Sequence, residues 1–555
     1  MTTPISTTKA AGGAASAPGL KRRLGVVGLL FASVGSIIGS GWLFGAMNAA
    51  ATTGPSAILS WAIGGVMIAF IGLVFAELGS MFPIAGGVVR FPHLAFGSFA
   101  SYTAGWSTWV AAATTAPIEV EGALQYATRY VDFTTPHKNG TVHTLTPLGF
   151  VVAIVLMAVF VVINYVGIAW FARINNVLVT WKLVMIVLVI VAFLTVSFHG
   201  SNLHSHGFFT HGAQGVFSAV ATSGIVFSFL GFRQAIELAG EGAKPKRDIP
   251  LAVLGSLLVT GILYVLLQIA FLVALDPHAV ATKGWDNVSD ILTNSAGPLA
   301  SVASAIGLGW LAVLLYIDAV VSPGDTGLIY TTTAARLSYA MGKNGNAPES
   351  LTRTTPSGAP WVSLLVAFIV GIIAFLPFPS WQQLVGFITS ATVLSFGPGP
   401  LVLGALRRRL PSLPRGFRIP GGDLIPILGF ASSNLIIYWT GWNTDWKLFV
   451  AILLGYVLLA MRELISAKTP PLELPSGAIW VIPWLVGLAV MSYIGDFDGG
   501  RGWVSFWPAI AIIVVFSVVI YYIGVNNSLP REAIERHIAE AEQETAEEDA
   551  ELATP

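Results

Sequence analysis

Residues 35–44 read GSIIGSGWLF and lie inside an apolar run that is long enough to cross a bilayer. Their glycines and serines weaken an α-helix, so the sequence predicts a break in the first membrane-spanning helix. Amide and carbonyl groups left unpaired in hydrocarbon cost several kcal/mol each unless protein or a ligand satisfies them. Two interpretations follow: a polar ligand binds at the break, or Gly35, Gly39 and Gly41 allow close packing of neighbouring helices.

The composition is that of an integral membrane protein. Of the 555 residues, 55% are hydrophobic and only 10% are charged, whereas soluble domains contain about 25% charged residues. The chain has no cysteine and a formal net charge of zero, which excludes thiol chemistry and gives no general attraction to nucleic acid. It also lacks a phosphate-binding loop, a zinc motif and a nucleophile elbow, so we expect no enzyme activity, no metal site and no cofactor.

The fold class that the sequence predicts is an all-α polytopic membrane protein. Apolar runs of about 20 residues, the length needed to cross a bilayer, occur throughout the chain. The fourteen predicted spans cover residues 24–50, 55–80, 97–130, 148–169, 174–198, 214–240, 249–275, 297–340, 359–378, 381–406, 424–441, 446–462, 477–495 and 502–526.

These spans divide the chain into four parts. Residues 1–20 are expected to form a disordered cytoplasmic tail, and residues 21–410 hold spans one to ten. Residues 411–527 hold spans eleven to fourteen, and residues 528–555 form an acidic tail of helical composition that we expect to be solvated in the cytoplasm.

Lysines and arginines fall in alternate loops, which predicts the orientation in the membrane. The clusters at 21–23 and 407–409 lie on the side that the positive-inside rule assigns to the cytoplasm. We therefore expect a multi-pass protein of the bacterial inner (plasma) membrane with both termini inside. The opposite side receives the histidine-rich loop 199–211, which either binds a metal or senses pH, or is an ordinary polar loop.

The sixth span contains a second interruption, FSFLGFRQAIELAGE, at residues 227–241. Ser228 and Gly231 weaken the helix, and the ionisable Arg233 and Glu237 lie in otherwise apolar sequence. Spans one and six are five helices apart. Interrupted helices at matching positions of two five-helix halves mark the substrate site of transporters built from inverted repeats. The second break therefore favours ligand binding over simple helix packing.

Three stretches together resemble the amino acid, polyamine and organocation transporter superfamily. They are GSIIGSGWLF in span one, FSFLGFRQAIELAGEGAKPKRDIPLAV in span six and ARLSYAMGKNGNAPESL at the end of span eight. The resemblance covers about residues 20–410 and implies a leucine-transporter-like five-plus-five inverted repeat, with about four helices appended. Within the superfamily, the chain is most similar to bacterial aspartate-proton symporters of the aspartate/glutamate transporter family.

The resemblance also implies a substrate site at the two breaks. The backbone amides of Ser40 and Gly41 and the Ser40 hydroxyl would bind the α-carboxylate, at the positive N-terminus of the resumed helix. Backbone carbonyls would bind the α-amino group, and Phe227 would cover the substrate. The residues of this predicted site are Ser36, Ile37, Gly39, Ser40, Gly41, Phe227 and Leu230.

Arg233 stands where relatives that handle cationic or neutral amino acids often carry an acidic residue. A charge inside a span is costly and functional by default, and the guanidinium fork matches a carboxylate in bidentate geometry. The sequence therefore predicts that Arg233 binds the side chain of an acidic substrate. The alternative is a permanent ion pair of Arg233 with Glu237 or Asp318.

Lys182 lies about two turns into span five, and the resemblance places it where proton-coupled members carry a lysine in the space that sodium occupies in other relatives. A buried lysine can release its proton near neutral pH. We expect Lys182 to couple transport to protons with Glu119, or else Glu121, as its partner; the alternative is a side chain that reaches the membrane surface. Asp318 and Asp325 are further candidates for a proton path, or form a satisfied core pair.

These residues predict a secondary active transporter that moves an acidic amino acid together with protons by alternating access. The proton is the coupling ion, and the expected partners are the amino acid and membrane lipid. The alternatives are a transporter of a neutral amino acid or amine, an amino acid exchanger, and a non-transporting amino acid sensor. The sequence leaves the oligomeric state open.

Overall fold

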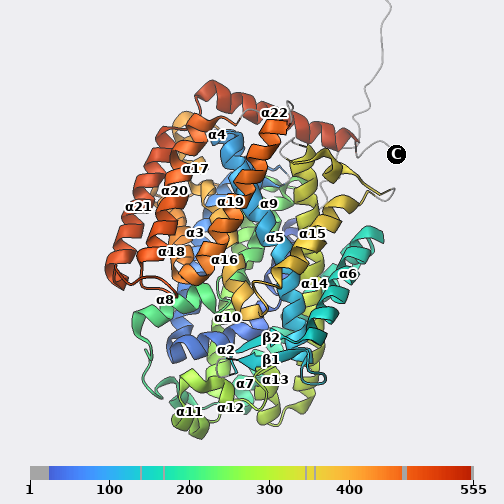
Figure 1. The fold of residues 1–555 in the computed structure, drawn as a ribbon, viewed down its shortest axis with the longest axis vertical. Helices are drawn as coiled ribbons and strands as arrows, with labels where there is room; N and C mark the ends of the chain where they lie inside the picture. The colour runs from blue at the N-terminus through green and yellow to red at the C-terminus, as the bar shows by residue number, and fades with distance from the viewer. Residues whose placement is uncertain are drawn as a thin grey trace, which may run out of the picture.

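The computed structural model describes residues 24–551 except residues 85, 138–139, 167–168, 344–346, 356–357 and 466–471. The tail predicted at 1–20 lies outside the described residues. The described chain is almost entirely helical, which confirms an all-α polytopic architecture (Figure 1). It also contains one antiparallel hairpin that the sequence analysis did not predict, formed by β1 (Thr134–His137) and β2 (Val142–Leu145).

Long helices form the body of the molecule, because a helix pairs its own backbone groups where no water is present. The uninterrupted helices of this body are α3 (Ala57–Met81), α5 (Ser98–Ala127), α6 (Pro147–Val166), α7 (Ala169–Val196), α10 (Pro245–Ala274), α14 (Gly309–Lys343), α15 (Trp361–Ala374), α16 (Trp381–Phe396), α17 (Pro398–Arg409), α18 (Leu424–Thr440), α19 (Trp442–Ile465), α20 (Leu474–Ile494) and α21 (Phe506–Asn526).

The first and sixth predicted spans are interrupted, as the sequence predicts. In the first span, three residues separate the end of α1 (Val26–Ile37) from the start of α2 (Gly41–Thr53). In the sixth, α8 (Gly212–Thr222) is followed by the 3₁₀ helix η3 (Phe227–Arg233) and the single turn α9 (Gln234–Glu237), with a bend of 47° at the break.

Shorter elements connect these helices. They are η1 (Gly54–Ser56), α4 (Gly87–Phe96), η2 (Gly200–Leu203), η4 (Ala239–Glu241), α11 (Pro277–Lys283), η5 (Trp285–Asn287), α12 (Val288–Ile291), α13 (Pro298–Ala305), η6 (Glu349–Thr352) and the C-terminal α22 (Arg531–Glu551).

All fourteen predicted spans fall on helical segments. Within the described ranges, nine helical segments are long and apolar enough to cross a membrane, or ten if the bent pair is counted as one span. This number is smaller than fourteen partly because α2 and α3 are joined in it and the apolar helices α1, α15 and α18 are too short. The buried α5, with Glu119 and Glu121, also falls outside it.

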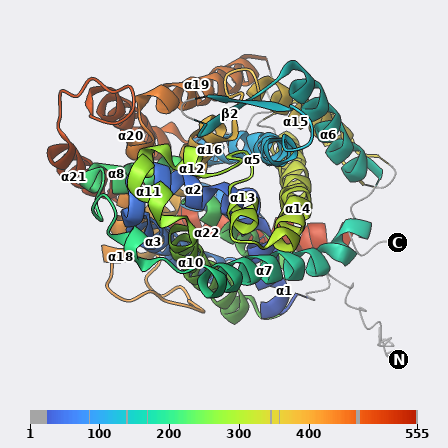
Figure 2. The same ribbon diagram turned by 90° about the horizontal axis from the view of Figure 1, so that it is seen from below.

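Helix α5 lies at the centre of the bundle and packs against α14 and α16, while α1 packs against α10 and η3. Seen from below, α6 and α21 lie on opposite sides of the bundle (Figure 2). Residues from five different helical segments can therefore surround one point in the interior.

The two ends of the bundle differ. One end, which we call the α22 face, carries α4, α22 and the arginines 407–409 that close α17. The other end, the hairpin face, carries β1, β2 and the short helices α11 to α13 (Figure 1). The sequence predicted a solvated tail after the last span, but α22 packs against α4 on the α22 face.

Candidate functional site

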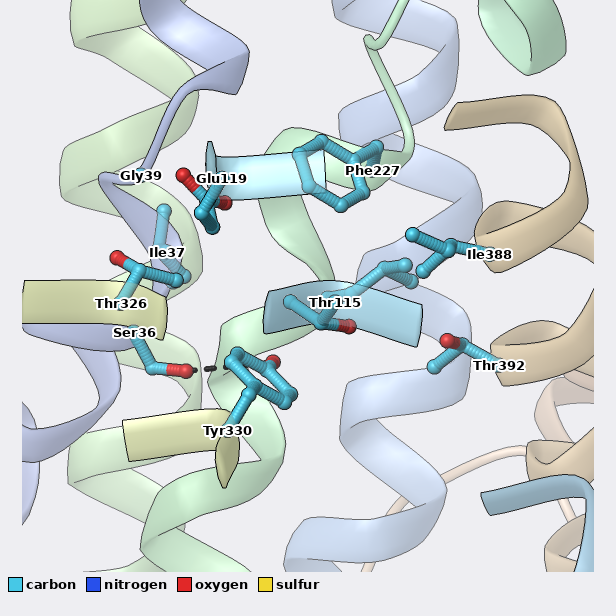
Figure 3. Close-up of a pocket in the computed structure, with 11 residues that line it drawn as sticks. Ser36, Ile37, Gly39, Thr115, Glu119, Phe227, Thr326, Tyr330, Ile388 and Thr392 are labelled. Carbon is cyan, nitrogen blue, oxygen red and sulfur yellow. Dashed lines mark hydrogen bonds between the residues drawn. The ribbon is translucent and has the colours of Figure 1, made fainter. Parts of the chain in front are cut away.

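A small cavity of about 10 Å³ lies where the two interrupted spans meet α5, α14 and α16. Figure 3 shows side chains from all of these segments pointing toward it. Of the predicted substrate residues, Ser36, Ile37, Gly39, Phe227 and Leu230 line the cavity. The other lining residues are Thr115, Glu119, Thr326, Tyr330, Ile388 and Thr392.

The two interrupted spans touch each other through their backbones. A Cβ atom at Gly231 would overlap the backbone of Ser36 and Ile37, so only glycine permits this approach. The Ser33 hydroxyl of the first span forms two hydrogen bonds with the sixth span. It donates to the Phe232 carbonyl (3.1 Å) and accepts from the Ala235 amide (3.1 Å). The two breaks therefore form one continuous polar site.

Polar groups at the end of α1 contact side chains from three other helices, two of which donate to its carbonyl groups. The Lys182 ammonium on α7 donates to the Gly35 carbonyl at 2.8 Å, and the Tyr264 hydroxyl on α10 donates to the Ile37 carbonyl at 3.3 Å. The Ser36 hydroxyl donates to the Tyr330 hydroxyl on α14 at 3.3 Å. These contacts satisfy part of the backbone that the break exposes.

The Glu119 carboxylate occupies the N-terminus of α2. Its Oε2 accepts the Ser40 amide hydrogen at 2.7 Å, while its Oε1 has no hydrogen-bond partner among the described residues and lies 2.6 Å from where a Cβ at Gly39 would be. Helix N-termini attract anions. Glu119 thus stands at the place that the sequence analysis assigned to the substrate α-carboxylate (Figure 3).

Ser40 and Gly41 lie directly behind the cavity wall. The Trp381 indole on α16 donates to the Ser40 hydroxyl at 2.7 Å. A Cβ atom at Gly41 would overlap the Ser228 hydroxyl and lie 3.2 Å from the Phe227 ring. The Phe227 ring meets the Trp381 ring edge-on, with 6.1 Å between centroids. Aromatic side chains therefore cover the start of α2.

Lys182 is fully buried and forms an ion pair with Asp325 of α14, with 2.5 Å between Nζ and Oδ2. It also donates to the Thr326 hydroxyl at 3.2 Å. Glu119, the partner that the sequence analysis suggested, instead binds Ser40. Lys182 therefore does not reach the membrane surface; it links α7 and α14 to the interrupted first span through Gly35.

The other carboxylates considered as candidates lie apart from the cavity lining. Asp318 is buried two turns before Asp325 on α14 and accepts hydrogen bonds from the Trp181 indole (2.8 Å) and the Ser322 hydroxyl (2.8 Å). Glu121 is 2% exposed, and neither of its oxygens has a hydrogen-bond partner in the part of the chain that the structure describes. Asp318 is thus hydrogen-bonded through Oδ1 alone, and its Oδ2, like both oxygens of Glu121, has no partner among the described residues.

Arg233 is 1% exposed and lies just outside the cavity lining. Its Nε is 3.4 Å from Glu237 Oε1, and its guanidinium carbon lies 5.1 Å from the centroid of the Tyr330 ring, which lines the cavity. Its Nε and Nη1 donate no hydrogen bond to any described residue. Arg233 is therefore paired with Glu237 but retains donor capacity beside the site.

Sequence reasoning singled out Glu119 but missed the other lining residues of α5, α14 and α16. A signal for them exists, because Thr115 precedes Glu119 by one helical turn, Thr326 precedes Tyr330 by one turn, and Thr392 follows Ile388 by one turn. Polar side chains at i and i+4 in an apolar helix share a face. The sequence alone does not say which such faces meet.

The histidine-rich loop 199–211 is held by separate local contacts. His206 Nε2 lies 3.1 Å from the Val280 carbonyl, and His211 Nε2 lies 3.2 Å from Asp286 Oδ1. Within the described ranges, no group of three or more histidine, aspartate or glutamate side chains is placed to hold a metal ion.

Comparison with known proteins finds relatives named for the transport of amino acids. The family described as "Amino acid permease" matches residues 24–517. In Bacillus subtilis (strain 168), the chain is 36% identical to a "Glutamate/serine transporter AimA" over 90% of this chain and 93% of that protein. It is 32% identical to an "Aspartate-proton symporter" of the same organism, over 93% of this chain and 98% of that protein. It is also 28% identical to a "Branched-chain amino acid permease BcaP" over 79% of this chain and 92% of that protein.

These matches extend over nearly the whole chain, including both helix breaks and every residue of the cavity. The protein is therefore a multi-pass membrane transporter of amino acids, not an enzyme, and it belongs to the amino acid permease family within the amino acid, polyamine and organocation superfamily.

Proposed function

We propose that this permease is a secondary active transporter that carries an acidic amino acid together with a proton by alternating access. The observation that carries the proposal is the buried Lys182–Asp325 ion pair, which contacts the interrupted first span at Gly35. Intramembrane charges are costly and functional by default. Two relatives named for acidic amino acids, one of them for protons, support the same substrate class.

We place the α22 face in the cytoplasm and the protein in the bacterial inner membrane. The arginines 407–409 and 415 lie on this face, and the positive-inside rule assigns such clusters to the cytoplasm. The C-terminal α22 is then cytoplasmic.

The proposed binding step exchanges one carboxylate for another. The substrate α-carboxylate takes the place of Glu119 at the Ser40 amide, because both anions are drawn to the same helix N-terminus. Glu119 then accepts a proton, since a second unpaired carboxylate at one site is strongly disfavoured. Lys182 and Asp325 exchange the proton with the side of release.

Replacing Glu119 by glutamine tests this exchange. Glutamine keeps an oxygen that accepts from the Ser40 amide but cannot take up a proton, so substrate binding should lose its pH dependence. Gradient-driven accumulation should fall to simple equilibration, while exchange of internal for external substrate continues. Binding across a pH series and counterflow in proteoliposomes measure both. Glu121→Gln, on the same helix and equally buried, is the matched control; an equal loss in this control would contradict the assignment.

Arg233→Gln tests the acidic substrate. A guanidinium bound to a carboxylate in a desolvated site contributes roughly 1.5–3 kcal/mol, so aspartate or glutamate binding should weaken by about one to two orders of magnitude. Alanine and serine should bind nearly unchanged. Arg336→Gln removes an exposed charge that also acts on Glu237 and serves as the control. Loss of all ligands alike would make Arg233 a structural partner of Glu237.

A neutral amino acid is the second candidate substrate. It is favoured by the position of Arg233 outside the cavity lining, behind Tyr330. Uptake of a radiolabelled amino acid panel into proteoliposomes, with and without an inward proton gradient, tests the whole proposal. Gradient-dependent accumulation of aspartate or glutamate supports it. Counterflow without any gradient response indicates an exchanger, and binding without uptake indicates a sensor.

A further inference from the structure

Helix α22 is docked on the α22 face rather than free in solvent (Figure 1). Ile534 is fully buried and His537 is 5% exposed, whereas Arg531, Glu535 and Arg536 on the same helix are exposed. This amphipathic pattern packs one face of α22 against the protein.

His537 is held by two groups that can only accept hydrogen bonds. Its Nδ1 lies 3.1 Å from the backbone carbonyl of His93 on α4, and its Nε2 lies 3.3 Å from Glu473 Oε1. A neutral imidazole carries a hydrogen on one ring nitrogen only, whereas the imidazolium carries one on each. The docked geometry is therefore matched by protonated His537.

Glu473, which contacts His537, also contacts the start of α5. Its Oε2 accepts the amide hydrogen of Ser98, the first residue of α5, at 2.9 Å. Glu473 itself has φ of +45°, which costs backbone energy for a residue other than glycine, and its side chain fills the space beside Gly97. Helix α5 carries Thr115 and Glu119 of the cavity.

Helix α4, which carries His93, also contacts the second break. The Gly86 amide at its start donates to the Glu237 carbonyl at 3.2 Å, and the Glu237 carboxylate is the ion-pair partner of Arg233. Arg90 of α4 pairs with Glu544 of α22 at 2.5 Å. Helix α22 is thus connected to the start of α5 through Glu473 and to the second break through α4.

We infer that α22 is a proton-operated latch on these helix ends: protonated His537 holds α22 on α4 and Glu473, and loss of the proton releases it. The inference rests on the proposed orientation only in assigning the proton to the cytoplasm. Released, α22 no longer joins α4 to Glu473, the residue that accepts the Ser98 amide hydrogen at the start of α5. An alkaline cytoplasm therefore releases α22 from the α22 face, and an acidic cytoplasm keeps it docked.

The groups around His537 set the direction of this response. The hydrogen bond to Glu473 raises the pKa of His537 above its usual value, and the nearby Glu540 adds to this effect. Burial lowers the pKa of His93, whose ring stacks on that of His537 at 4.4 Å between centroids, and the charges of His537 and Arg90 lower it further. Burial acts to raise the pKa of Glu473, but the hydrogen bonds from His537 and the Ser98 amide outweigh it and lower the pKa.

The direction of the pH dependence follows from the linkage between protonation of His537 and docking of α22. His537 stabilises docking fully below its unperturbed pKa of about 6.5, and this contribution is lost as the pH rises through the raised value. Between the two values, the ratio of docked to released α22 changes by up to about tenfold per pH unit. Glu473 acts in the opposite sense: its contribution to docking is complete above its unperturbed pKa and is lost as the pH falls through the lowered value.

A distance measurement in nanodiscs tests the latch without substrate or gradient, so its outcome is independent of proton-coupled transport. The chain has no cysteine, so Ala539→Cys on α22 and Ser412→Cys after α17, both exposed, take two spin labels. At about pH 6 we expect one narrow distance, and at about pH 8.5 a broader and longer distribution, because the imidazole titrates between them.

Variants assign the transition to one residue. His537→Gln should give the broad distribution at both pH values, and Glu473→Gln, which keeps an acceptor oxygen without the charge, should move the transition to lower pH. His204→Gln, an exposed histidine of the loop 199–211, should leave it unchanged. A narrow distance at both pH values in the parent, or a transition that persists in His537→Gln, would overturn the inference.

Discussion

Replacing Lys182 by alanine is expected to abolish proton-driven accumulation of substrate in proteoliposomes. The variant removes the ammonium that joins Asp325 to the Gly35 carbonyl at the first break, so nothing links a proton to the position of the interrupted span. Lys182→Arg should fail in the same assay, because arginine keeps the charge but cannot release a proton. Accumulation against its gradient, measured over a range of external pH, should fall to the level of equilibration in both variants.

Folding must be separated from coupling in this experiment. Removing one partner of a buried ion pair leaves the other charge uncompensated, at a cost of about 3–5 kcal/mol. The double variant Lys182→Ala/Asp325→Asn removes both charges and should recover stability, measured by thermal unfolding, without recovering accumulation. If accumulation survives in Lys182→Ala and Lys182→Arg, the proton travels elsewhere, with Glu119 and Asp318 as the remaining candidates.

Gly41→Val is expected to abolish substrate binding, with a loss of at least about two orders of magnitude in affinity. The new Cβ would overlap the Ser228 hydroxyl and press on Phe227, and the γ-carbons would cover the amide groups at the start of α2. Gly39→Val should have a similar effect, because its Cβ would lie 2.6 Å from Glu119 Oε1 and 3.0 Å from the Thr326 hydroxyl. Equilibrium binding in detergent measures this loss.

Gly309→Val is the control for the effect of an added valine on insertion and yield. Gly309 begins α14, and a Cβ there meets no atom within 4 Å. This control should bind substrate normally. Unchanged affinity in Gly41→Val, in protein that inserts and folds, would remove the broken first span from the site.

The sequence predicted the parts of the fold that depend on local chemistry. The breaks at GSIIGSGWLF and FSFLGFR follow from glycine and serine within apolar runs, and both appear where expected. The spans follow from hydropathy and length. The hairpin of β1 and β2 could not be predicted, because strands of four residues such as TTPH and VHTL have no pattern that distinguishes them from a loop.

The candidate site was predicted less completely, because it depends on which helix faces meet. Lys182 was identified as an intramembrane charge, but its partner is Asp325 on α14 and not Glu119 on α5, a choice that helix packing alone decides. Tyr330 and Ile388 are ordinary residues of apolar helices and become cavity residues only through that packing. Docking of α22 was also missed, because the acidic residues on its surface dominate its composition.

The backbone contact at Gly231 bears on how substrate choice evolves in such carriers. Two main chains meet directly there, and in the proposed binding mode the carboxyl group common to all amino acids is bound by main-chain atoms, which no substitution alters. The side chains that face the cavity from the surrounding helices include Thr115, Tyr330, Ile388 and Thr392. A lineage can therefore exchange one amino acid for another through a few substitutions in α5, α14 and α16 while the interrupted spans stay as they are. Relatives named for glutamate and serine, for aspartate and for branched-chain amino acids, at 36%, 32% and 28% identity, are the diversity that such a division of roles allows.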